Sequence, residues 1–200
     1  MARRTFTSAE AIAAESVEVE DNARRFYYVP DFKQVDDELL FIWAEAVSAY
    51  LAGQGGTRIT QIEAAFLSDI IRPWLTESFD EGWGPVRAAR ELRKRWDGLK
   101  GPRAERIART ELVSANNFGS MLGAESVQQR LGRGLRKAWL ATMDGRVRET
   151  HAAADGQTRG LQEAFNVGGA SLQYPGDPGA PAAEVINCRC TQTFELIQDE

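Results

Sequence analysis

Hydrophobic residues at helical spacing predict a first helix from Asp37 onward. The buried stripe consists of Leu39, Leu40, Trp43, Val47, Tyr50 and Leu51, and Gly53 is a suitable end. A second helix is expected within residues 57–73, where Thr60 and Glu63 fit a capping box. We expect Pro73 to end that helix, because proline cannot continue the hydrogen-bond ladder.

A third helix is expected to open at Pro85, a favoured first-turn residue. Its predicted buried side consists of Val86, Ala89, Trp96 and Leu99. Glycine and proline at 98–103 then break the pattern and give the best domain boundary. Beyond the break, helical spacing resumes over residues 104–122 and predicts a fourth helix.

The last part of the chain changes character. Residues 137–143 are typical of a short strand, Asp144-Gly145 indicates a turn, and a helical turn is expected to carry His151. A rigid loop follows at 174–181, with three prolines. Residues 184–197 alternate with period two and predict a half-buried strand with Cys188 and Cys190 on its inward face.

These elements predict an α+β fold, with a mainly helical N-terminal half and a small mixed α+β domain that ends in a C-terminal strand. We expect three parts: an extended or weakly ordered segment at 1–36, a helical docking region at 37–100 and a compact domain at 101–200. The aromatic candidates for docking are Trp43, Tyr50, Trp74 and Trp83. Each would serve the docking region only if its side chain is not part of the core. Trp43 and Trp96 are the ones most expected in the core.

The composition is typical of a globular protein, with 43% hydrophobic and 26% charged residues. No apolar run approaches the roughly 20 residues of a membrane-spanning helix, and the N-terminus has no apolar stretch of a secretory signal. Two cysteines cannot form a disulfide framework, which favours synthesis in a reducing cytoplasm.

The net charge of −5 is divided unevenly along the chain. Residues 1–80 carry 7 basic and 14 acidic side chains, residues 81–148 carry 15 and 7, and residues 149–200 carry 2 and 8. A basic centre between acidic ends suits a polyanion or an acidic partner. The alternative is that these charges face water or pair with the acidic ends.

The only histidine has two interpretations. If 146–156 is helical, Arg148, His151 and Asp155 lie on one face, where they suit acid–base chemistry or an oriented metal ligand. The alternative is a histidine that Asp155 fixes as a structural contact.

The cysteines are also open to more than one interpretation. Neighbours on one face of a strand lie about 6.5–7 Å apart, which disfavours a disulfide. Cys188 and Cys190 can instead bind a structural zinc ion, with His151 and Asp155 completing four ligands. The alternative is two small buried hydrophobic residues. The chain has no nucleophile elbow, phosphate loop or His-Glu-x-x-His motif.

Several motifs in order resemble a known family. These are "RIARTEL" at 106–112, "KAWLATMDGRVRETHAAADGQ" at 137–157 and "YPGDPGAPAAEVINCRC" at 174–190. Together they are similar to the C-terminal domain of phage-Mu-F-like minor head proteins, over roughly residues 100–194. Beyond the four metal candidates, the signature positions are Arg109, Thr110, Glu111, Trp139, Asp144, Arg148, Gly156, Asn187 and Arg189.

The resemblance implies a structural virion component and not an enzyme. Such proteins are associated with the portal vertex inside the phage head. The implied partners are the portal protein or the major capsid protein, and the packaged DNA is a further expected contact through the basic centre. The resemblance leaves the roles of the signature residues open, and we expect most of them to build the domain.

Two other functions compete with this one. The first is a metal-dependent hydrolase or nuclease centred on His151, with Asp155, Cys188 and Cys190 as ligands. The second is non-specific DNA binding by residues 85–136.

Overall fold

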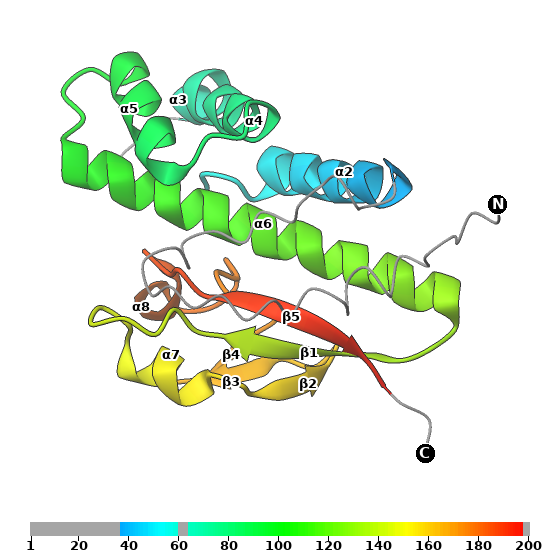
Figure 1. Ribbon diagram of the computed structural model, residues 1–200. Coiled ribbons are helices and arrows are strands. Elements are labelled where there is room, and N and C mark those ends of the chain that lie inside the picture. The colour runs from blue at the N-terminus through cyan, green and yellow to red at the C-terminus, as the bar shows by residue number, and fades with distance from the viewer. Residues whose placement is uncertain (1–36, 60–63, 198–200) are drawn as a thin grey trace, which may run out of the picture.

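The computed structural model describes residues 37–59 and 64–197. A long central helix, α6 (Gly101–Leu131), separates a helical lobe from a lobe that contains the strands (Figure 1). The expected α+β class is therefore confirmed. The predicted segment 1–36 and the capping box of Thr60 and Glu63 lie outside the described residues.

The helical lobe consists of α2 (Asp37–Gly53), α3 (Ala64–Phe66), a π-helical turn (Leu67–Ile71), α4 (Arg72–Asp80) and α5 (Pro85–Arg95). Its core fills the space between these helices and α6. The largest of its buried side chains are Tyr50, Ile71, Trp74, Trp83 and Leu92. Burial of these large apolar surfaces is the main stabilising contribution of the lobe.

The prediction that Pro73 ends its helix was wrong. The chain remains helical from Ala64 to Asp80, because a π-turn at Leu67–Ile71 is followed directly by α4, which begins at Arg72. Pro73 thus lies in the first turn of α4, directly after the wider π-turn, and its ring does not end the helical run. The periodicity of the sequence did not reveal the π-turn.

The expected buried side of α5 was partly wrong. Val86 is 76% exposed, whereas Ala88, Ala89 and Leu92 are buried. Tyr50, Trp74 and Trp83 are also buried, so their side chains are not available to a docking surface. The Trp74 Nε1–H donates to the carbonyl oxygen of Ala88, which ties α4 to α5. Trp43 and Trp96 pack against the core, as expected.

Helix α6 is longer than the predicted 104–122. It begins at Gly101, has Pro102 in its first turn and ends at Gly132, which has a left-handed φ of 61°. Helix α2 packs along it on the side of the helical lobe, and β5 contacts it from the other lobe (Figure 1). One helix therefore contributes to the cores of both lobes.

The second lobe contains a three-stranded antiparallel sheet of order β2-β1-β5. Its strands are β1 (Leu135–Leu140), β2 (Thr158–Gly160) and β5 (Thr191–Leu196). A hairpin of β3 (Phe165–Val167) and β4 (Ala170–Leu172) and the short helices α7 (Glu149–Ala154) and α8 (Ala182–Val185) complete the lobe.

Two strand predictions require correction. The strand expected at 137–143 spans 135–140, and the strand expected at 184–197 is divided into α8, an irregular segment and β5. The division occurs at Asn187, which has a φ of 62°. An extended strand cannot pass through that left-handed conformation. Both cysteines therefore precede β5, although both are buried as predicted.

Candidate metal centre

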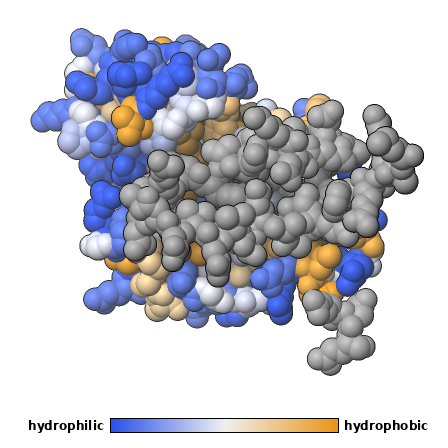
Figure 2. Space-filling view, in the orientation of Figure 1, coloured by the Kyte–Doolittle hydropathy of each residue, from blue (hydrophilic) through white to orange (hydrophobic). Residues whose placement is uncertain are grey.

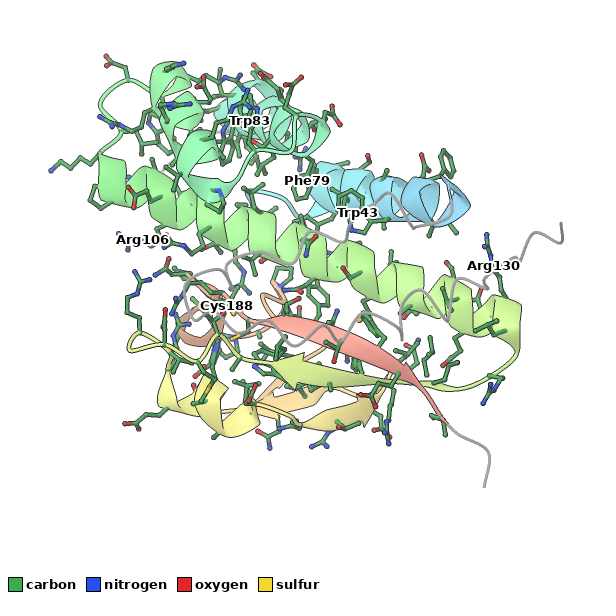
Figure 3. The ribbon with its side chains drawn as sticks, viewed as in Figure 1. Trp43, Phe79, Trp83, Arg106, Arg130 and Cys188 are labelled. Atoms are coloured by element: carbon green, nitrogen blue, oxygen red, sulfur yellow. The ribbon has the colours of Figure 1, made fainter. Side chains whose placement is uncertain are left out.

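Three side chains that can bind metal meet beneath α6. His151 comes from the middle of α7, and Cys188 and Cys190 come from the irregular segment between α8 and β5. Figure 3 shows Cys188 below α6. The left-handed turn at Asn187 directs this segment toward α7. Three of the four ligands predicted for zinc therefore lie together in the structure.

The donor atoms are close enough to share one ion. His151 Nδ1 lies 3.2 Å from Cys190 Sγ and 3.7 Å from Cys188 Sγ. All three donor atoms lie within 4.8 Å of one another. The side chains are 1–3% exposed and both cysteines are free thiols. This His/Cys/Cys cluster therefore has the donor types and spacing that a zinc ion uses.

The other side of the imidazole faces a carboxylate. His151 Nε2 lies 3.1 Å from Glu184 Oε2, and the Thr150 hydroxyl donates to the same oxygen at 2.8 Å. The indole of Trp139 packs against the imidazole edge to face, with ring centroids 5.5 Å apart. Glu184 was not predicted from the sequence, because nothing in its local spacing distinguishes it from other acidic residues near a helix.

The two thiols are electrostatically different. A hydrogen bond from Cys188 lowers the pKa of Cys190 to about 5, and the neighbouring His151 also lowers it. The same hydrogen bond to Cys190, together with burial, raises the pKa of Cys188. The surroundings therefore favour ionisation of Cys190 over Cys188, and the thiolate is the form that binds metal.

Asp155 is not part of the cluster, contrary to the predicted ligand set. It caps the C-terminal end of α7, is exposed, and its Oδ1 accepts a hydrogen bond from the backbone N–H of Ala141 at 2.7 Å. The expected shared helix face of Arg148, His151 and Asp155 does not form, because α7 spans only 149–154. Asp155 instead fixes the end of β1 next to α7.

Most signature residues hold the irregular segment in place. Arg109 donates to Asn187 Oδ1, and the Asn187 backbone N–H donates to Thr110 Oγ1 at 2.8 Å. Arg148 donates to the carbonyl oxygen of Ile186. These contacts fix the peptide unit before the left-handed residue and the side chain of that residue.

A second pair of signature residues fixes the turn before α7. Arg189 forms an ion pair with Asp144, and that pairing lowers the pKa of the Asp144 carboxyl. Gly156, with a φ of 72°, leads from α7 toward β2. The family signature therefore supports the geometry of the lobe and of the cluster within it.

Glu111 has a different role. It is buried in α6, and its Oε2 accepts a hydrogen bond from the backbone N–H of Gly56 at 2.8 Å. This contact ties the turn after α2 to the central helix. Glu111 therefore belongs to the helical lobe and not to the metal cluster.

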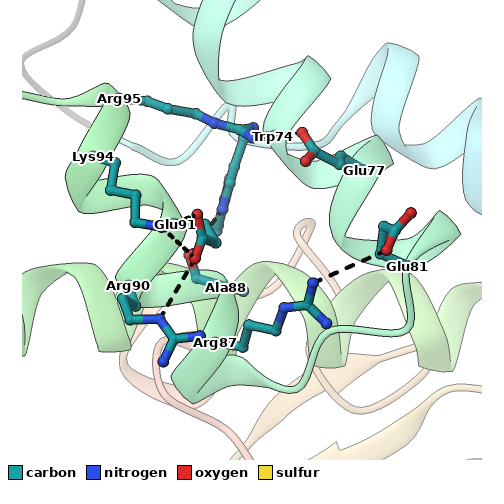
Figure 4. A network of polar contacts seen from close by, with 9 residues as sticks. All are labelled: Trp74, Glu77, Glu81, Arg87, Ala88, Arg90, Glu91, Lys94 and Arg95. Carbon is teal, nitrogen blue, oxygen red and sulfur yellow. Dashed lines mark hydrogen bonds and ion pairs between the residues drawn. The ribbon is translucent and has the colours of Figure 1, made fainter.

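A basic surface covers α5 and the first turns of α6. Residues 85–109 carry nine basic and three acidic side chains. Part of this charge is paired: Arg87 contacts Glu81 at 4.0 Å, and Lys94 contacts Glu91 at 2.8 Å (Figure 4). The surface over α4 and α5 is predominantly hydrophilic (Figure 2).

Three further basic side chains on this surface form no ion pair with another described residue. Within residues 37–59 and 64–197, no ion pair involves Arg93, Lys100 or Arg106, and all three are exposed. Arg106 lies near the N-terminal end of α6, far from Arg130 at its other end (Figure 3). We define the basic face as Arg93, Lys100 and Arg106.

Comparison with known families gives the chain its assignment. The sequence profile described as "Phage Mu protein F like protein" matches residues 69–193. The chain belongs to the phage Mu F-like protein family. The resemblance noted in the sequence is confirmed, and the family indicates a phage head morphogenesis protein. The match begins at residue 69, so it includes α4 and α5 as well as the strand lobe.

Part of this Mu F-like chain is similar in sequence to a curated protein. It is the "NAD(+)--arginine ADP-ribosyltransferase EFV" of Enterococcus faecalis (strain ATCC 700802 / V583), which is 39% identical over 94 residues. The match covers 47% of this chain and 19% of the transferase. The chain therefore spans about a fifth of the length of the transferase. No solved structure matches the chain significantly. Among the described residues, no helix combines the length and the apolarity needed to cross a bilayer.

Proposed function

We propose that this protein is a minor component of a phage head, bound at or near the portal vertex on the inner side of the capsid. The observation that carries the proposal is the family match over residues 69–193. The proposed partners are the portal protein and the major capsid protein. The proposed role is structural and not enzymatic, in agreement with a signature whose residues mainly fix backbone segments.

Purified heads and proheads test this proposal directly. We expect the protein to be present in few copies per particle, to co-purify with the portal protein and to form chemical cross-links to it. Cryo-electron density against the inner side of the portal ring would support the assignment. Absence of the protein from both heads and proheads would contradict it.

We also propose that the basic face contacts the packaged DNA. Arg93 in α5, Lys100 directly before α6 and Arg106 in α6 are exposed cations that phosphates can reach. Such contacts release counterions, so the affinity for double-stranded DNA falls as salt rises, by a factor that grows with the number of phosphate contacts.

A charge-matched pair of variants tests the DNA contact. Replacing Arg93, Lys100 and Arg106 by Gln is expected to reduce the slope of log affinity against log salt by about 0.9 for each lost contact, roughly 2 to 3 in total. The control replaces Arg130, Arg133 and Arg146, which removes the same charge elsewhere, and is expected to change the slope little. Equal effects from the two triple variants would contradict a contact at this face.

For the His/Cys/Cys cluster we propose a structural zinc ion. Its support is a set of three buried donors from α7 and the irregular segment, at distances that one ion can span. When bound, zinc would join α7 to the segment before β5, so the binding energy would add to folding stability. The competing metal-dependent hydrolase has less support, because His151 is 2% exposed and Asp155 lies outside the cluster.

Elemental analysis of protein purified under reducing conditions tests the zinc proposal. We expect about one zinc per chain, and we expect a strong chelator to lower the melting temperature. Metal-free protein that gains no thermal stability on addition of zinc would overturn the proposal. The head-protein assignment would not be affected by that result.

A further inference from the structure

Glu184 occupies a distinctive position beside the metal cluster. It lies in the short helix α8, and its side chain is 15% exposed. Its Oε2 is 3.1 Å from His151 Nε2 and also accepts the Thr150 hydroxyl hydrogen at 2.8 Å. Both contacts hold one carboxylate oxygen in a fixed position next to the imidazole.

The two nitrogens of His151 face different groups. Nδ1 faces the two sulfurs, and Nε2 faces the carboxylate. A metal ion between the sulfurs and the imidazole needs the lone pair of Nδ1, which places the proton on Nε2. The Nε2–H then donates to Glu184, so the carboxylate favours the imidazole tautomer that leaves Nδ1 free for the metal.

The orientation of the ring is fixed in the same way. The carboxylate holds the Nε2 edge of the imidazole, and the perpendicular Trp139 indole restricts its rotation. A histidine ligand whose outer nitrogen donates to a carboxylate is a recurrent arrangement at zinc sites, because it sets the ring angle and raises ligand basicity.

The sequence limits the rest of the coordination. The chain contains one histidine and two cysteines, and the cluster uses all three. A fourth ligand from this chain must therefore be an oxygen donor. With only three nitrogen and sulfur ligands, the affinity of the site depends strongly on how well each one is oriented.

We propose that Glu184 is a positioning residue of a zinc site formed by His151 Nδ1, Cys188 Sγ and Cys190 Sγ. The inference rests on the proposed zinc ion. Glu184 acts through the imidazole and does not itself bind the metal.

Zinc affinity in matched variants tests this role. With metal-free full-length protein and zinc alone, measured by competition with a chromophoric chelator, Glu184→Gln is expected to bind about 10- to 100-fold more weakly than wild type. Glu149→Gln is the control, since it removes the same charge from an exposed position in the same helix as His151. Its affinity is expected to equal that of wild type.

The single histidine permits a spectroscopic test. Protein labelled with ¹⁵N-histidine gives signals from His151 alone. On zinc addition we expect the Nδ1 resonance to shift and Nε2 to retain its proton. In Glu184→Gln we expect a weaker hydrogen bond at Nε2, seen as a changed Nε2 proton shift. Metal ligation through Nε2 would overturn the inference.

Thr150→Val provides a second variant if Glu184→Gln does not fold. It removes the hydroxyl that anchors the carboxylate and leaves Glu184 in place, so a smaller loss of zinc affinity is expected. If wild type binds no zinc, the zinc proposal itself fails. If wild type binds zinc and both variants bind it equally well, only the role of Glu184 is overturned.

Discussion

Two buried ionisable side chains, Glu111 and Lys137, have pKa values shifted toward their neutral forms by burial. Glu111 lies in the interface between α6 and the turn after α2, and burial raises its pKa from 4.5 to about 7. Lys137 is fully buried in the strand lobe, where its Nζ donates to the carbonyl oxygens of Leu161 and Gln173, and burial lowers its pKa to about 8. Each residue forms useful hydrogen bonds but loses hydration of its charge.

The raised pKa of Glu111 predicts a specific pH dependence. The folded protein binds a proton more tightly than the unfolded chain, so stability falls as pH rises from about 4.5 to about 7. A shift of this size corresponds to about 3 kcal/mol. We expect Glu111→Gln to match wild type near pH 4.5 and to exceed it above pH 7, as measured by urea unfolding. Glu105→Gln, an exposed change on the same helix, is the control and should show no such trend.

At the scale of elements, a glycine in α6 permits close packing of α2 against that helix. A Cβ atom at Gly119 would lie 2.8 Å from Nε1 of Trp43 and 2.9 Å from Cγ2 of Val47, both on α2. A Cβ atom at Gly123, one turn further along, would have no neighbour within 4 Å. The first glycine therefore permits the approach of α2, whereas the second only lowers the helix propensity of α6.

The two glycines predict opposite effects of the same substitution. We expect Gly119→Ala to destabilise the protein by about 1–3 kcal/mol, because α2 must move away or Trp43 must change its position. Gly123→Ala is expected to stabilise it by about 0.5–1 kcal/mol through helix propensity. Thermal or urea unfolding measures both. Stabilisation by both substitutions would contradict the close packing of α2 on α6.

For the molecule as a whole, α6 connects the two lobes through buried polar contacts. Asn117 Nδ2 donates to the carbonyl oxygens of Pro175 and Cys190, and its Oδ1 accepts from the Thr191 hydroxyl. The Ser114 hydroxyl donates to the carbonyl oxygen of Gly176. Loss of any of these partners would leave buried acceptors or donors unpaired, so the strand lobe depends on an intact α6.

This shared helix predicts that both lobes unfold together. In a Trp139→Phe variant, the remaining four tryptophans all report on the helical lobe, while the only two cysteines report on the strand lobe. Tryptophan fluorescence and thiol reactivity are expected to give the same urea midpoint. Adding Asn117→Ala is expected to lower both midpoints and to expose the thiols first. Separate midpoints without that change would contradict the coupling.

Several elements were predictable because they depend on local sequence. The spacing of apolar residues indicated α2, α5 and the middle of α6, and Asp144-Gly145 indicated the turn after β1. The same local patterns did not reveal the π-turn before Pro73 or the irregular segment that contains the cysteines. A π-turn and a left-handed residue are stabilised by contacts with distant parts of the chain, such as that of Thr110 with Asn187.

The sequence by itself determined the family, the α+β class and the burial of the two cysteines, because ordered motifs and residue periodicity are properties of the chain alone. The tertiary structure decided which side chains complete the cluster. In the structure, Asp155 contacts the backbone at the end of β1, and Glu184 contacts the imidazole. The physical reason is that a ligand set depends on where separate segments meet in space, and that position is fixed by packing against α6 and not by spacing along the chain.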